Sequence, residues 1–272
     1  MSFTTLKFAL NALPRSVRYP IIKHIVARPQ RLPPPDSDFM RTAKRISYGN
    51  QRNKIGWSAG TGPLVVCIHG WGGSGGADMG HIAGALVDAG FHVVAIDMTA
   101  HGESPGKSIG FGQFITDISE FSAGLTEPVY GYVGFSAGGL SMMAARSQGH
   151  LSAPKYVCIS TPHTPYPPLV LLQKKLGIDN QLQQRFQKYL AGEFTMDWED
   201  ITATCFRGRP GESLQLIYDT SDTFIHHSDG DKIQAAWPEA QLIKTAQNKH
   251  REMPQSRTVI TEIVRFISDR AV

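Results

Sequence analysis

The stretch Gly-Phe-Ser-Ala-Gly at residues 134–138 has the residue types and spacing best suited to chemistry. An apolar run precedes it and a helical pattern follows it, so Ser136 is predicted to stand at a sharp turn between a strand and a helix. The glycines two positions before and two after remove Cβ atoms that would crowd such a turn. Because three fixed residues recur by chance in a chain of this length roughly one time in ten, the pattern needs partners elsewhere.

A base and an acid are the first partners to look for. A serine hydroxyl is a weak nucleophile at neutral pH, so Ser136 needs a histidine as base and, usually, a carboxylate to orient it. The expected chain order is serine, acid, histidine, with the last two in loops after late strands. Asp222 follows the apolar run that ends at Tyr218, and His250 follows the run that ends at Thr245. Both residues meet the expected order.

Other residues compete for these two roles. The competing carboxylates directly follow a strand or have positions typical of helix caps; they are Asp219, Asp229 and Asp231. The competing histidines near the same edge are His163, His226 and His227. Only His250 falls in the loop before the final predicted helix, so we favour Asp222 and His250.

Acyl transfer also needs two N–H donors where negative charge develops on the former carbonyl oxygen. The backbone of Ala137 qualifies by position, at the start of the helix after Ser136. We expect the second donor at Trp71, in a loop at residues 69–76 that has five glycines among eight residues. A dinucleotide-binding loop is a less favoured alternative, because the glycines lack the G-x-G-x-x-G spacing, although Asp97 does end the next predicted strand.

Strand, loop and helix alternate four times around these residues. The predicted strands are 64–68, 92–96, 129–134 and 155–159, and the predicted helices between and after them are 77–89, 112–125 and 137–147. Such alternation predicts an α/β fold with a parallel sheet, right-handed crossovers and helices on both faces. Ligands then bind beyond the carboxyl ends of the strands. We also expect a hairpin of strands 41–48 and 54–58, strands at 213–218 and 241–245, and a last helix at 259–267.

The alternation is interrupted at about residues 162–209. Four prolines open this stretch, and two apolar periods of helical spacing then flank residues 177–180. About fifty residues is long for an ordinary crossover connection. We therefore expect a small helical insertion.

Composition excludes several classes of protein. The chain has 272 residues and a net charge of +4, which does not indicate a nucleic-acid-binding protein. Its three cysteines, Cys67, Cys158 and Cys205, have no paired spacing, so neither a disulfide framework nor a zinc site is predicted. No secretion signal pattern and no apolar run of membrane-spanning length is present. We expect a cytoplasmic protein with a small-molecule substrate.

The N-terminal segment differs from the rest. Residues 1–45 carry nine Lys or Arg and two Asp, and a proline run at 33–35 separates a basic helical arm, residues 1–40, from a domain at 41–272. The arm could rest on a membrane or a partner, or pack on the domain with solvated charges. Charged surface is ordinary for a terminal helix, so we favour the packed helix over membrane contact.

With these motifs assembled, the chain resembles the α/β-hydrolase superfamily, in particular its small serine esterase-like bacterial members. The matching motifs span roughly residues 46–269: the stretches 69–74, 97–104 and 134–138, the Asp222 turn, and His250 before the last helix. The resemblance implies an α/β-hydrolase fold, with an eight-stranded, mostly parallel sheet and a small helical cap between the sixth and seventh strands. It implies that Ser136 is the nucleophile, Asp222 the acid, His250 the base, and Trp71 and Ala137 the oxyanion donors.

The resemblance also implies that four residues brace loops: His69, Asp97, His101 and Ser104. The chain departs from the family pattern at Ala100 and Lys249, where glycine is more common, and its first forty residues have no clear counterpart.

We therefore expect a serine hydrolase that cleaves a carboxylic ester or thioester through an acyl-enzyme intermediate and uses no metal or cofactor. Two alternatives stay open. One is a non-catalytic small-molecule-binding protein on the same fold. The other is an acyltransferase or a carbon–carbon bond hydrolase, which would use the same three residues.

Overall fold

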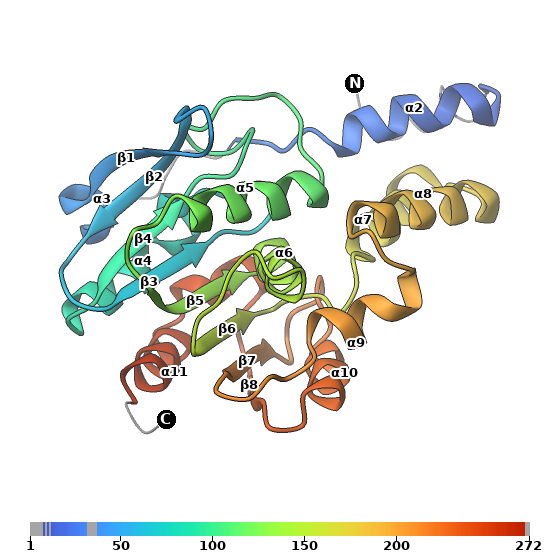
Figure 1. Cartoon of the computed structure of the whole chain (residues 1–272). Coiled ribbons are helices and arrows are strands. Elements are labelled where there is room, and N and C mark those ends of the chain that lie inside the picture. Colours follow the sequence, from blue (N-terminus) through green and yellow to red (C-terminus); the bar gives the residue numbers. More distant parts are fainter. Residues whose placement is uncertain (1–7, 9, 11, 32–36, 270–272) are drawn as a thin grey trace.

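An eight-stranded sheet forms the centre of the molecule (Figure 1). The computed structural model describes residues 8, 10, 12–31 and 37–269. The strands are β1 (Lys44–Tyr48), β2 (Lys54–Ala59), β3 (Leu64–Ile68), β4 (His92–Ile96), β5 (Val129–Phe135), β6 (Lys155–Ile159), β7 (Ser213–Asp219) and β8 (Gln241–Thr245). Their order is β1-β2-β4-β3-β5-β6-β7-β8, and all neighbours from β4 to β8 are parallel. The predicted eight-stranded, mostly parallel sheet is confirmed.

Helices cover both faces of this sheet. They are α2 (Arg15–Val26), α3 (Asp38–Thr42), α4 (Gly75–Asp88), α5 (Phe111–Ala123), α6 (Ala137–Ser147), α7 (Pro167–Leu176), α8 (Asn180–Glu193), α9 (Ile201–Cys205), α10 (Ser228–Ala236) and α11 (Arg257–Ser268), with short 3-10 helices η1 (Trp198–Asp200) and η2 (His250–Gln255). Strand β3 shows why its sequence is apolar throughout. Leu64, Val66 and Ile68 face one buried core, while Val65 and Cys67 face the other. Both faces exclude water, so no polar alternation remains.

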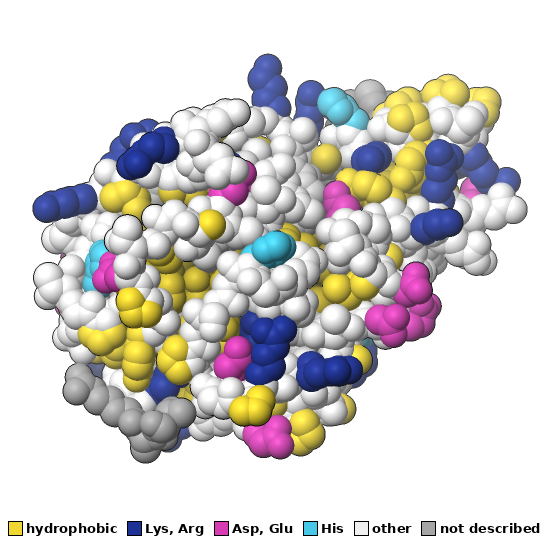
Figure 2. Space-filling model, in the orientation of Figure 1, with side chains coloured by type: hydrophobic (Ala, Val, Ile, Leu, Met, Phe, Trp, Pro, Cys, Tyr) yellow, Lys and Arg dark blue, Asp and Glu magenta, His cyan; other side chains and the backbone are white. Residues whose placement is uncertain are grey.

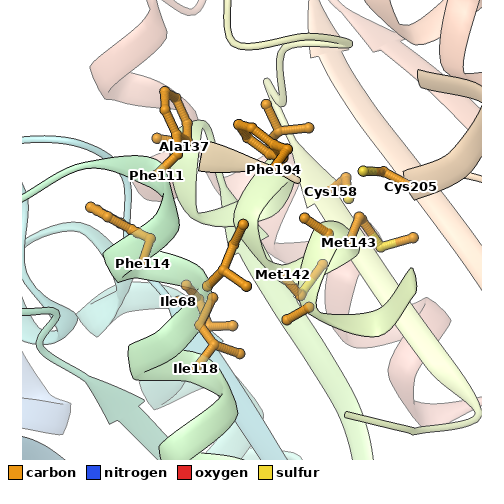
Figure 3. Close-up of a cluster of buried hydrophobic side chains, with 14 of the residues drawn as sticks. Ile68, Phe111, Phe114, Ile118, Ala137, Met142, Met143, Cys158, Phe194 and Cys205 are labelled. Atoms are coloured by element: carbon orange, nitrogen blue, oxygen red, sulfur yellow. The ribbon is translucent and has the colours of Figure 1, made fainter. Parts of the chain in front are cut away.

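The core between the sheet and helices α5 and α6 is packed with large side chains. Figure 3 shows Phe114 and Ile118 of α5 in one cluster with Met142 of α6. Cys158 and Cys205 belong to the same cluster, and burial raises the pKa of both thiols to about 12. Thiols held neutral in this way act as small core residues.

A cap of helices lies between β6 and β7, as predicted. Gly177 adopts the left-handed conformation, φ 60°, and so ends α7. Two residues later the Asp179 side chain accepts a hydrogen bond from the Leu182 N–H at 3.0 Å, which begins α8. The short elements η1 and α9 follow, and the sequence had not indicated either of them.

Helix α2 lies against this cap (Figure 1). The Tyr19 and Phe186 ring centroids are 4.7 Å apart, and Arg15 Nε lies 2.9 Å from Asp179 Oδ2. Arg31, beyond the end of α2, donates to the carbonyls of the loop at 102–106. Residues 1–7, 9 and 11 of the predicted basic arm, and its proline run at 33–35, fall outside the described residues.

Some predicted bounds were wrong. The first strand begins at Lys44, not at 41, because Asp38–Thr42 form helix α3. The Ser37 side chain caps this helix by accepting from the Met40 N–H at 3.3 Å. The last helix begins at Arg257, two residues before the prediction. Within the described residues, no helix has the length and apolar character needed to span a bilayer.

Candidate active site

Ser136 occupies a strained turn between β5 and α6. Its backbone has φ 52° and ψ −122°, a conformation that non-glycine residues rarely adopt and that clusters at functional sites. The flanking glycines make room for it. A Cβ on Gly134 would lie 2.6 Å from Gly139 Cα, and a Cβ on Gly138 would lie 2.2 Å from the His69 carbonyl oxygen. Any larger residue at either position would collide with backbone.

The structure brings Ser136, His250 and Asp222 together at the carboxyl edge of the sheet. His250 Nε2 lies 3.0 Å from Ser136 Oγ, and His250 Nδ1 lies 2.7 Å from Asp222 Oδ2. Ser136 is 5% exposed and Asp222 is 3% exposed, while the His250 side chain keeps 15% exposure. The imidazole thus joins a buried hydroxyl to a buried carboxylate and retains a narrow contact with solvent.

Asp222 is held as an anion. Burial alone would raise the pKa of its carboxyl group, but the hydrogen bond and charge of His250 and the N–H groups of Ile225 and Phe224 outweigh burial and lower the pKa. Those N–H groups donate to Oδ1 at 3.0 and 2.8 Å, which leaves Oδ2 for His250. An ionised Asp222 keeps the proton of neutral His250 on Nδ1, so Nε2 is the free acceptor that faces Ser136.

Aromatic rings and a helix start fix the position of the His250 imidazole. Its centroid lies 4.9 Å from the Phe135 ring and 4.8 Å from the Phe224 ring. His250 opens η2, whose start is fixed by the Lys249 N–H donating to the Glu252 carboxylate at 2.8 Å. These contacts restrict the ring while leaving its two nitrogens to the polar partners.

The glycine-rich loop after β3 lies beside the nucleophile. A Cβ on Gly70 would lie 3.1 Å from Ser136 Cβ, which shows how closely the backbone approaches. Within the described part of the chain, the backbone N–H groups of Trp71 and Ala137 donate to no acceptor of the protein. The Trp71 ring stacks on Phe114 with centroids 5.9 Å apart, which holds the loop. Both N–H groups predicted as oxyanion donors are therefore available to a ligand.

Two buried histidines brace this loop. His69 Nε2 accepts from the Met98 N–H at 3.0 Å, and its Nδ1 donates to the Gly70 carbonyl at 2.7 Å. His101 Nε2 accepts from the Gly72 N–H at 2.9 Å. Burial lowers the pKa of His69 to about 4 and that of His101 to about 3. Both rings are neutral near pH 7 and have no remaining nitrogen for acid–base chemistry.

Asp97 and Ser104 brace the next loop. Asp97 accepts from the Gly75 N–H at 2.6 Å and from the Glu103 N–H at 3.0 Å. Ser104 Oγ donates to the Asp97 carbonyl at 2.6 Å and accepts from the Ile55 N–H at 2.9 Å. These hydrogen bonds connect β2, the end of β4 and the start of α4.

Most of the competing residues have other partners. Asp219 accepts from Thr245 Oγ1 at 2.7 Å and so braces the β7 turn. His163 Nδ1 lies 3.0 Å from Asp229, and His226 contacts the side chain of Ser228. Among the residues that the structure describes, no group of three or more His, Cys, Asp or Glu is arranged to hold a metal ion.

Sequence reasoning missed three contributors to the site. Phe135 and Phe224 pack on the imidazole, and both are adjacent or nearly adjacent to a predicted site residue. The Asp78 carboxylate occupies the space that a side chain at position 73 would need, since a Cβ on Gly73 would lie 1.7 Å from it. Burial raises the pKa of Asp78 to about 6. Closeness in sequence to Ser136 and Asp222 was the one feature that could have indicated Phe135 and Phe224. No feature of the sequence indicated Asp78.

Residues 63–204, just over half of the chain, match the family model described as the alpha/beta hydrolase fold. An esterase of Pyrococcus furiosus has a similar structure, with a TM-score of 0.67 and 20% identity over 89% of this chain and 96% of that chain. A monoacylglycerol lipase of Paleococcus ferrophilus gives 0.61 and 19% over 79% and 98%. A Rhodococcus esterase gives 0.58 and 15% over 84% and 99%. No curated protein matches the sequence. At these sequence identities, the similar structures support the fold alone.

Proposed function

Since this chain belongs to the alpha/beta hydrolase fold family, we propose that it is a serine hydrolase that cleaves a carboxylic ester or thioester. The observation that carries the proposal is the chain of hydrogen bonds from Ser136 through His250 to Asp222, with distances of 3.0 and 2.7 Å. It lies next to two unused N–H groups. A nucleophile, a base, an orienting acid and an oxyanion site are the parts that acyl transfer needs.

In the first half of the proposed reaction, Ser136 Oγ attacks the carbonyl carbon as its proton passes to His250 Nε2. The N–H groups of Trp71 and Ala137 stabilise the negative charge on the former carbonyl oxygen. The imidazolium then gives its proton to the leaving alkoxide or thiolate, and an acyl-enzyme remains. Asp222 stabilises the imidazolium and keeps it oriented, without taking a proton itself.

In the second half, water attacks the acyl group while His250 Nε2 accepts one of its protons. The tetrahedral intermediate collapses, the proton returns to Ser136 Oγ, and the carboxylic acid leaves. Each group therefore ends in the state in which it began. The helices of the cap between β6 and β7 are proposed to shape the acyl pocket.

Carboxylic esters are the substrate class to test first, because two of the similar structures are named esterases and one a monoacylglycerol lipase. A series of p-nitrophenyl esters and acyl thioesters of increasing chain length would be assayed with wild-type protein and Ser136→Ala. The proposal predicts hydrolysis of at least one length, lost by several orders of magnitude in the variant. Product analysis with and without an acceptor alcohol separates a hydrolase from an acyltransferase. Equal rates for both proteins would contradict the proposal.

A further inference from the structure

Within the described part of the chain, helix α2 leaves a row of large apolar side chains exposed. Leu13, just before the helix, is 36% exposed, and Val17, Ile21 and Ile25 are 43%, 36% and 37% exposed. They recur at every fourth position, so within the helix they lie along one face. We refer to these four residues as the outer stripe. Isolated exposed aliphatic residues are normal, but a continuous row marks an interaction site.

Packing on the cap does not account for the outer stripe, because α2 packs on the cap through other residues. Ile22 is 1% exposed, the Tyr19 ring packs on Phe186, and Arg18 Nη2 lies 3.3 Å from Asp179. At 100° per residue, Ile22 lies about 100° around the helix axis from Ile21 and about 140° from Val17, so it points in a different direction from most of the outer stripe. The helix is thus apolar on two faces, and only the inner one is covered by the described chain.

Helix α7 adds to the exposed apolar surface at the same end of the molecule. Its Val170 and Leu171 are 38% and 36% exposed, and Lys174 follows one turn later. Figure 2 shows hydrophobic side chains along the outer edge of α2, with Lys and Arg side chains gathered below them over the cap helices. Apolar and basic side chains therefore occur together at this end.

The charge of this end is positive. Residues 12–31 and 167–193 contain nine Lys or Arg against two acidic residues, although the whole chain has a net charge of only +4. Both acidic residues are engaged within the protein. Asp179 pairs with Arg15, and Glu193 accepts from the Phe111 N–H at 2.9 Å. The rest of the cap adds three acidic residues, Asp197, Glu199 and Asp200, so this end keeps a net charge of +4 to complement an external anion.

We propose that the outer stripe and the basic residues around it form a docking surface for a lipid bilayer with anionic headgroups. An apolar helix face flanked by Lys and Arg is the composition of helices that lie in a membrane interface. The stripe would enter the acyl boundary while the cations meet the headgroups. A second copy of this chain is a poorer occupant, because two surfaces of the same positive charge repel each other. This surface is independent of the proposed hydrolase chemistry.

Co-sedimentation of the full chain with phosphatidylcholine vesicles, with and without phosphatidylglycerol, tests the proposal. Wild-type protein should bind only the anionic vesicles, and less so as salt is added. Val17→Ser with Ile21→Ser should lower the partition coefficient about tenfold by removing apolar area. Lys174→Glu with Lys188→Glu should lower it by a similar factor.

Two matched controls come from parts of the chain away from the cap. Lys44→Glu makes one charge reversal of the same kind on the edge strand β1, and Ile260→Ser replaces one aliphatic side chain on α11, where the side chain is partly buried. Both should bind vesicles like the wild type. Thermal unfolding of every variant would establish that it is folded.

Three results would overturn the proposal. They are failure of the wild type to bind anionic vesicles, equal binding to both vesicle types, and a dimer in light scattering that the stripe variants abolish. Hydrolysis of a soluble ester, measured on the same samples, should be unchanged by the stripe variants. A wild type that binds vesicles but hydrolyses no ester would contradict the proposed function alone.

Discussion

Gly138→Ala tests how the elbow and the glycine-rich loop work together. The added Cβ would lie 2.2 Å from the His69 carbonyl oxygen and 2.9 Å from the Ile68 carbonyl oxygen. Because carbon and oxygen atoms cannot approach so closely, the loop must retreat by about 1 Å. Trp71 is two residues beyond His69, so its N–H moves with the loop. A displacement of this size costs roughly 10²-fold in rate, and overpacking lowers the free energy of unfolding by about 1–3 kcal/mol.

Initial rates with a p-nitrophenyl ester, together with thermal unfolding, would measure both effects. We expect kcat/KM to fall about 10²-fold through kcat, because the moved N–H serves the transition state more than the bound substrate. Gly192→Ala is the matched control, since a Cβ there has no atom within 4 Å and the residue lies inside α8. It should retain activity and gain up to about 1 kcal/mol of stability. A Gly138→Ala protein with activity within twofold of wild type would refute the reasoning.

Three further predictions follow from the geometry. Asp222→Asn should reduce kcat about 10⁴-fold with an unchanged circular dichroism spectrum, because the amide no longer fixes the proton on His250 Nδ1; a loss under tenfold would speak against it. Burial lowers the pKa of His69 to about 4 in the folded chain. The contribution of its neutral ring to the free energy of unfolding is therefore complete above about pH 6.5 and declines as the pH falls toward 4. Urea unfolding at pH 4.5 should show about 2 kcal/mol less stability from this group than at pH 7. Arg31→Ala removes donors to three loop carbonyls and should lower the free energy of unfolding by about 1 kcal/mol, whereas the exposed Arg28→Ala should change it little, as thermal melts would show.

The parallel part of the sheet was predictable because of its burial. A strand with cores on both faces carries an unbroken apolar run, and such runs stand out in the sequence at residues 64–68 and 155–159. The turn at Ser136 was predictable from its flanking glycines, because the close backbone contacts there leave no room for a side chain. Asp222 and His250 were then found from their order along the chain.

Other features depended on contacts between distant segments. The apolar periodicity of α2 predicted a helix, but its inner face is defined by a partner, Asp179, more than 160 residues away. Helix α3 could not be predicted, because its five residues are too few to show a helical repeat of apolar positions. The packing of Phe224 on His250 arises only when the loops after β7 and β8 are brought together.

Covalent labelling with a fluorophosphonate probe shows directly whether Ser136 is the nucleophile, because such a probe reacts with an activated serine. We expect the wild-type protein to gain the mass of one probe at Ser136, Ser136→Ala to stay unlabelled, and His250→Ala to be labelled far more slowly. Equal labelling of the wild type and Ser136→Ala, or no labelling of the folded wild type, would contradict this role of Ser136.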